Sequence, residues 1–166
     1  MNDKKIFVGG TLIVILIIFG AYFFLSDNQK PTAKIDSYQA TNKQRPQVQT
    51  SQTVADLGEM KVSDVKSYDF TVKNIGSAPL QLSQITSSCG CTFGQVIYEG
   101  VESNKFGMHV QNNYVAEISP QKEAIVRVIY QPSIMPVYGA VERDVYVTTN
   151  DPQNPKLTFQ VKAFVK

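Results

Sequence analysis

The sequence predicts an all-β protein, an antiparallel β-sandwich of about seven strands that is preceded by a single N-terminal transmembrane helix and a flexible linker. Three observations support this organisation. A long uncharged run begins near the N-terminus, a polar stretch follows it, and short segments of alternating apolar and polar residues fill the remaining length. A chain of 166 residues has room for one ordinary domain and these attached segments.

The N-terminal segment has the length of a membrane span. Residues 6–25 (IFVGGTLIVILIIFGAYFFL) carry no charge, and about twenty residues at about 1.5 Å each cross a hydrocarbon layer of roughly 30 Å. Lys4 and Lys5 favour keeping the short head, residues 1–5, in the cytoplasm. The sequence therefore predicts a single-pass anchor with the rest of the chain outside the cytoplasm. A cleaved signal peptide is the alternative, although FGAYFFLSD offers only a weak cleavage site.

Residues 26–52 are predicted to be a disordered linker. The segment is rich in Gln, Lys, Ser, Thr and Asn, contains two prolines, and shows no apolar alternation. A flexible coil of this length has an r.m.s. span of roughly 30 Å. The folded domain is then expected to occupy residues 53–166.

Alternating residues predict the strands of this domain. Apolar and polar side chains alternate through 68–73 and again through 157–165, where Leu157, Phe159, Val161, Ala163 and Val165 share one face. Residues 124–131 are almost continuously apolar, which is typical of a central strand, and residues 141–149 form a further strand segment. Because no stretch of the domain has the pattern of a long amphipathic helix, these short strands favour an Ig-like sandwich.

Two turns separate strands for local reasons. In the phrase NIGSAP, Gly76 can adopt the positive φ that a turn requires, and Pro79 presets φ where the next strand begins. Before the last strand, the side chains of Asn150 and Asp151 can bond to nearby backbone amides, and Pro152 restricts the turn that follows. These five residues are therefore interpreted as structural.

A family resemblance covers most of residues 56–165. The opening DLG, the phrase VKNIGSAPL, the CGCT block and the TTNDP turn before the final strand together resemble the bacterial family called domain of unknown function 1573, which is similar to the Hydin-like ASH domains. The resemblance implies an Ig-like fold, export from the cytoplasm and no established biochemical activity. It makes the bacterial cytoplasmic membrane the expected location. The chain departs from the family pattern between Val96 and Ile118, where a longer segment replaces a short connection.

The CGC motif holds both cysteines of the chain, Cys89 and Cys91, and three interpretations remain open. A local disulfide would close a loop of three residues and contribute only about 1.6 kcal/mol through chain entropy. Two converging thiolates could instead bind a soft metal, and Cu(I) tolerates as few as two ligands. In that case Met108 and His109, in the longer segment, are candidate partners for the metal. The third interpretation is thiol exchange.

Composition argues against two large classes of function. The net charge of +2 leaves no basic field to bind nucleic acid, and a single histidine among scattered acidic residues argues against an enzyme. The sequence therefore predicts a membrane-anchored, extracytoplasmic Ig-like binding or structural module without a resident cofactor, whose partner is another envelope protein. The alternative hypothesis is a Cu(I)-handling or thiol-redox accessory protein centred on the CGC motif.

Overall fold

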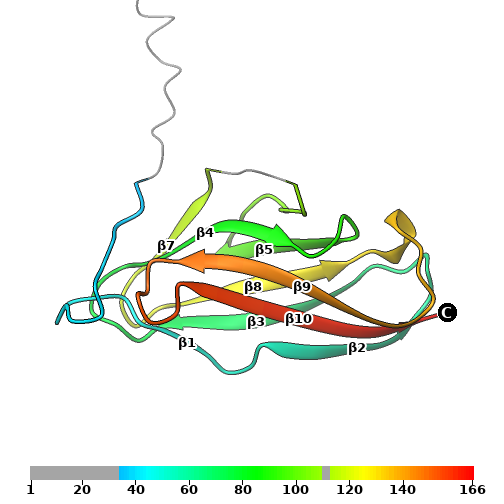
Figure 1. Cartoon of the computed structure of the whole chain (residues 1–166), viewed down its shortest axis with the longest axis horizontal. Helices are drawn as coiled ribbons and strands as arrows, with labels where there is room; N and C mark the ends of the chain where they lie inside the picture. The colour runs from blue at the N-terminus through cyan, green and yellow to red at the C-terminus, as the bar shows by residue number, and fades with distance from the viewer. Residues whose placement is uncertain (1–33, 110–112) are drawn as a thin grey trace, which may run out of the picture. The chain divides into compact units, whose positions relative to one another are not determined.

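The computed structural model describes residues 34–109 and 113–166, which fold into two five-stranded sheets (Figure 1). In spatial order, the first sheet contains β1 (Val48–Thr50), β3 (Lys66–Asn74), β8 (Glu123–Tyr130), β5 (Thr92–Tyr98) and β6 (Val101–Glu102). The second sheet contains β2 (Val54–Met60), β10 (Lys156–Val165), β9 (Gly139–Thr149), β4 (Leu80–Ser87) and β7 (Val115–Ile118). One short 3-10 turn, η1 (Pro132–Ile134), follows β8.

The predicted all-β sandwich is confirmed, with ten strands in the described residues instead of about seven. The sheets are not wholly antiparallel as predicted, because β2 pairs parallel with β10. The extra strands are mostly short edge strands such as β1 and β6, whose few residues give no clear alternation. The predicted head and transmembrane helix, residues 1–5 and 6–25, lie outside the described residues, as does the first part of the predicted linker. Within 34–109 and 113–166, no helix has the length and apolar character needed to span a membrane.

The core lies between the two sheets and follows the alternation of the strands. In β10 the five apolar residues predicted to share one face are all buried, whereas Thr158, Lys162 and Phe164 on the other face are exposed. Phe159 is fully buried, and its ring lies 5.0 Å, centre to centre, from the ring of Phe70 on β3. The two sheets are thus joined by aromatic and aliphatic packing, as the pattern predicts.

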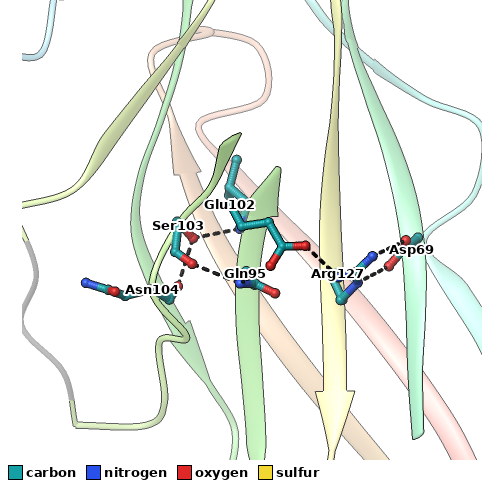
Figure 2. Close-up of polar contacts among 7 residues, drawn as sticks. Asp69, Gln95, Glu102, Ser103, Asn104 and Arg127 are labelled. Carbon is teal, nitrogen blue, oxygen red and sulfur yellow. Dashed lines mark hydrogen bonds and ion pairs between the residues drawn. The ribbon is translucent and has the colours of Figure 1, made fainter. Parts of the chain in front are cut away.

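Strand β8 is central, as its apolar sequence predicts, because it pairs antiparallel with both β3 and β5. Its outward Arg127 forms a polar ladder across the strands (Figure 2). The guanidinium donates to both carboxylate oxygens of Asp69, at 2.7 and 2.9 Å, and to Glu102 at 3.1 Å. Gln95 in turn donates to Glu102 and to the carbonyl of Ser103. These exposed pairs fix strand register more than they stabilise the fold.

The linker prediction is wrong for its described part, because residues in the range 34–52 contact the sandwich. Strand β1 pairs antiparallel with β3, and Asp36 donates its backbone N–H to the side chain of Gln81. The carbonyls of Arg45 and Gln47 accept backbone hydrogen bonds from Ser77 and Ile75. The segment makes these contacts through its own backbone groups, which every residue carries. Its side-chain composition therefore did not reveal them.

The positive φ predicted for Gly76 is not observed, and a close backbone approach requires the glycine instead. Its φ is not among the positive values of the described glycines. Instead, a Cβ on Gly76 would lie 2.4 Å from the carbonyl oxygen of Arg45 and 2.5 Å from the backbone nitrogen of Gln47. The buried side chain of Asn74 organises the same turn, accepting from the N–H of Gly76 and donating to the carbonyl of Ala78. The glycine is required because the incoming chain passes directly against it.

The second turn is held by two buried polar side chains. Asn150 accepts from the backbone N–H of Gln81 on β4, and its amide donates to the carbonyl of Pro79. Asp151 accepts from the backbone N–H of Val48 at 3.0 Å, as well as from Gln153 and Asn154 inside the turn. Burial acts to raise the pKa of Asp151, but the hydrogen bonds from Asn154, Val48 and Gln153 outweigh it and hold this pKa below its ordinary value. The turn therefore ties β9, β4 and the incoming chain together, beyond its predicted local role.

Part of the longer segment from Val96 to Ile118 forms a hairpin. Strand β5 continues to Tyr98, and Glu99 and Gly100, both with positive φ, turn the chain into β6. Two consecutive residues with positive φ are the signature of the turn that matches strand twist in a tight hairpin. Phe106 then pairs with Gly94 before the chain reaches β7.

Candidate functional site

The CGC motif lies in the connection from β4 to β5, where the chain passes from the second sheet to the first. Cys89 and Cys91 form a disulfide with their Cα atoms 5.3 Å apart, so the motif is in its oxidised form. Backbone bonds hold the turn on both sides, because Thr92 donates to the carbonyl of Cys89 and Gln131, just after β8, donates to that of Cys91. The turn is anchored independently of the sulfur atoms.

The two sulfur atoms have different surroundings. Cys91 is fully buried, with 0% of its surface exposed, whereas Cys89 is only partly buried. The Cys89 sulfur accepts the backbone N–H of Cys91 at 3.2 Å and lies 3.3 Å from the hydroxyl oxygen of Thr92. The same hydroxyl lies 3.9 Å from the Cys91 sulfur. Donors therefore gather around the more accessible sulfur.

An unusual polar pair lies between the sheets at this end of the sandwich. Tyr130 pairs with Thr92 across β8 and β5, and the guanidinium carbon of Arg143 lies 5.6 Å from the centre of the Tyr130 ring. The Tyr130 hydroxyl and the Arg143 Nε are buried and have no hydrogen-bond partner among the described residues. Buried polar groups normally find a partner, often an ordered water. The ring face partly compensates the Arg143 charge through a cation–π contact.

An apolar loop borders the CGC turn. Residues 134–138 (IMPVY), called the apolar loop below, are all exposed and contain no charged residue. A Cβ on Gly90 would lie 3.6 Å from the Met135 sulfur, so the loop packs beside the disulfide turn. Tyr138 is 71% exposed, an unusual position for a tyrosine ring that could pack in a core. The disulfide turn and the apolar loop together form the candidate functional site.

The structure separates the predicted metal-site residues into two groups. It brings Cys89 and Cys91 together, but as a disulfide, whose sulfurs are not thiolates, so the Cu(I) hypothesis applies only to the reduced chain. Met108 and His109 are exposed turn residues after Phe106, and no described contact joins them to the CGC turn. Across the described ranges, no group of three or more His, Cys, Asp and Glu side chains is placed to hold a metal ion.

Sequence reasoning missed the other members of this site. Thr92 stands next to the CGC motif and has the character of an ordinary strand residue. Arg143 alternates with Val141 and Val145, which is a signal for an inward side chain, but its place over the Tyr130 ring depends on tertiary packing. The apolar loop and the residues just before it gave one usable signal, an uncharged run between two predicted strands that contains Pro132 and Pro136. Its place beside Gly90 depends on tertiary packing.

A family model described as "Protein of unknown function (DUF1573)" matches residues 48–165. No curated protein matches the chain. Among solved structures, a protein of unknown function from Porphyromonas gingivalis W83 is similar, with 21% identity, a TM-score of 0.58, and coverage of 78% of this chain. This chain spans about half of that protein, 52% of its length.

The ASH/PapD-like domain 7 of human CEP192 is also similar, with 10% identity, a TM-score of 0.50, and coverage of 81% of this chain and 94% of that domain. The E. coli chaperone DraB shares 11% identity over 73% of this chain and 55% of its own, but its TM-score is only 0.42. The likeness to the Porphyromonas gingivalis protein and to the CEP192 domain establishes the Ig-like, PapD-like fold of the domain and nothing about its activity.

Proposed function

The chain belongs to the family described as Protein of unknown function (DUF1573), and we propose that it is a membrane-anchored binding module of the bacterial envelope. The anchor is the uncharged run at residues 6–25, and Lys4 and Lys5 keep the head in the cytoplasm. The sandwich is then outside the cytoplasm, where disulfides form and persist. The Cys89–Cys91 bond supports this location because a reducing compartment would disfavour it.

The apolar loop is the observation that carries the binding role. Four large apolar side chains of the loop are each at least 42% exposed: Ile134, Met135, Val137 and Tyr138. They lie within five consecutive residues. Exposing several large apolar side chains in one place is costly in water unless another surface covers them. Tyr and Met are also enriched where proteins bind one another. The partner is therefore an envelope protein with an apolar surface, and the chain acts by binding without catalysis.

Site-specific photo-crosslinking in living cells tests this role. A photoreactive phenylalanine analogue is placed at Tyr138 in the full chain and, as a matched control, at Val101, which is equally exposed at 71% but lies on β6. We expect one discrete crosslinked protein from position 138 and none from position 101. Val137→Ser should weaken that crosslink without changing the amount of folded protein. Equal crosslinking at both positions, no product at position 138, or a product whose added mass is that of a phospholipid would refute the proposal.

A second experiment tests the topology. The full chain should remain in the membrane fraction after a high-salt wash, and protease added from outside should remove the sandwich while sparing the N-terminal head. Release of a soluble form that begins near Ser26 would show that residues 6–25 are a cleaved signal peptide.

Handling of Cu(I) by the reduced chain is the alternative function. Two thiolates at Cys89 and Cys91 match the low coordination number that Cu(I) accepts. Met135, beside Gly90, offers a thioether closer to this turn than the sequence pattern suggested. This function requires reduction of the disulfide, so it stays a prediction for the reduced protein.

A further inference from the structure

We propose that the Cys89–Cys91 disulfide is a reversible thiol-exchange site for a protein dithiol, and that Cys89 is the sulfur that forms the mixed disulfide. This activity goes beyond the binding role and does not depend on it. Three features of the turn support it: unequal access to the two sulfurs, hydrogen-bond donors placed at one of them, and backbone contacts that hold the turn without the S–S bond.

Access favours attack at Cys89. Its side chain is partly exposed, while Cys91 is completely buried within the core cluster. An incoming thiolate must reach a sulfur atom along the S–S direction, so a buried sulfur is a poor target. The mixed disulfide therefore forms at Cys89, and Cys91 is the sulfur that leaves in this step.

Thr92 has a position that the oxidised form alone does not explain. The residue is fully buried, and the two cysteine sulfurs are the hydrogen-bond partners described for its hydroxyl. A disulfide sulfur is a weak acceptor, so burying a hydroxyl against it gains little. A thiolate is a strong, charged acceptor, and the hydroxyl at 3.3 Å and the Cys91 N–H at 3.2 Å both lie beside the Cys89 sulfur. These donors favour the reduced form, with the negative charge on Cys89.

The turn keeps its shape without the bond. The Ser87 hydroxyl donates to the carbonyl of Cys89 at 2.8 Å, and Thr92 and Gln131 supply backbone hydrogen bonds on either side. A bond between residues two positions apart closes a small loop and removes little freedom from the unfolded chain. The S–S bond can therefore open while the turn stays folded. Reversible exchange at this turn requires that stability.

The exchange proceeds in two displacement steps that conserve electrons and protons. A thiolate of the partner attacks the Cys89 sulfur, the S–S bond breaks, and Cys91 leaves with the bonding electron pair and takes up a proton. The second thiol of the partner then loses its proton and, as a thiolate, attacks the partner sulfur that is bonded to Cys89. Cys89 leaves as a thiolate that the Cys91 N–H and the Thr92 hydroxyl stabilise. The partner is oxidised to a disulfide, and this chain receives two electrons and one proton, which resides on Cys91.

The choice of sulfur is tested with single-cysteine variants of the purified full chain. Cys91→Ser retains Cys89, and Cys89→Ser retains Cys91. Each variant is mixed with oxidised glutathione, and mass spectrometry follows the glutathione adduct, with circular dichroism confirming that both variants are folded. We expect the adduct on Cys91→Ser to form at least about ten times faster. Equal rates, or faster reaction of Cys89→Ser, would overturn the assignment.

The role of Thr92 is tested at equilibrium. The full chain is incubated in mixtures of reduced and oxidised dithiothreitol, and the disulfide fraction is measured after thiol trapping. Because a hydrogen bond to a charged acceptor is lost, Thr92→Val should shift the equilibrium about ten-fold toward the disulfide. Thr92→Ser, which restores the hydroxyl, should return it to within about two-fold of the wild type.

Ser87→Ala is the matched control, because its hydroxyl bonds to the Cys89 carbonyl and not to a sulfur. It should also stay within about two-fold of the wild type. If Thr92→Val leaves the equilibrium unchanged, or if Ser87→Ala shifts it equally, the hydroxyl has no special effect on the reduced form and the proposal fails. None of these measurements involves Tyr138, so their failure is distinguishable from failure of the binding role.

Discussion

Truncation of the chain before β1 is predicted to destabilise the sandwich, although residues 34–52 have the composition of a linker. We compare domains that begin at residues 34, 43 and 53. The second retains Arg45, Gln47 and Val48, while the third removes them. The series thus isolates the segment that contacts Gly76 and Asp151.

The size of the effect follows from the groups that lose their partners. Removing Arg45 and Gln47 leaves the backbone N–H groups of Ser77 and Ile75 unpaired, at about 1 kcal/mol each. Removing Val48 also removes the backbone N–H that donates to the Asp151 carboxylate at 3.0 Å. A hydrogen bond to a charged acceptor contributes about 1.5 to 3 kcal/mol. Water replaces some of these bonds and the ordering of the segment is no longer needed. We therefore expect a net loss of about 2 to 4 kcal/mol.

Urea unfolding followed by far-UV circular dichroism measures this loss, since the chain has no tryptophan to report by fluorescence. Starting at residue 43 removes the bonds of Gln81 to Asp36 and Lys34 and the bond from Arg45 to the carbonyl of Ala40. Because these bonds are exposed or only partly buried, water can replace them, and their loss should cost less than about 1 kcal/mol. Most of the loss should appear between starts 43 and 53. Equal unfolding free energies for starts 34 and 53 would show that residues 34–52 contribute nothing to stability. The predicted linker boundary at residue 52 would then be correct.

Three further predictions concern the core, the second turn and the reduced site. Phe159→Ala should lower the unfolding free energy by about 3 to 5 kcal/mol, and Gln160→Ala by under about 0.5 kcal/mol; equal losses in urea titrations would contradict the strand register. Because the folded-state pKa of Asp151 is depressed, its stabilisation is present above the ordinary value of 3.8 and is lost as pH falls through the lower folded value. Replacing Asp151 with Asn should flatten this acid-side slope in unfolding measured from about pH 5 downward, and an unchanged slope would assign it to other carboxylates. Under competition from a chelator, the reduced chain should bind Cu(I), and changing both Cys89 and Cys91 to Ser should abolish binding; failure of the reduced wild type to compete would end the Cu(I) hypothesis.

Local chemistry by itself determined the sandwich and its principal strands. Alternation of apolar and polar residues has a period of two in any strand, so the buried face of β10 and the central position of β8 could be predicted without knowing their neighbours. The local bond of Asp151 was also predictable, because its side chain accepts from the backbone N–H of Gln153 two residues on. The bonds of Asn150 to Gln81 and Pro79 join segments far apart in the chain and were not predictable. The family motifs also stand in the sequence itself, and the family match confirms them.

Only the tertiary structure decided the features that depend on segments far apart in the chain. Gly76 is required because the backbone near Arg45 passes against it. The apolar loop belongs to the candidate site because Met135 lies beside Gly90. Thr92 becomes notable only when both sulfurs are seen around its hydroxyl. A sequence pattern reports which face of a strand a residue occupies, but not which distant backbone or side chain covers that face. Those contacts arise from the pairing and packing of the two sheets, so the composition of the contacting segments did not disclose them.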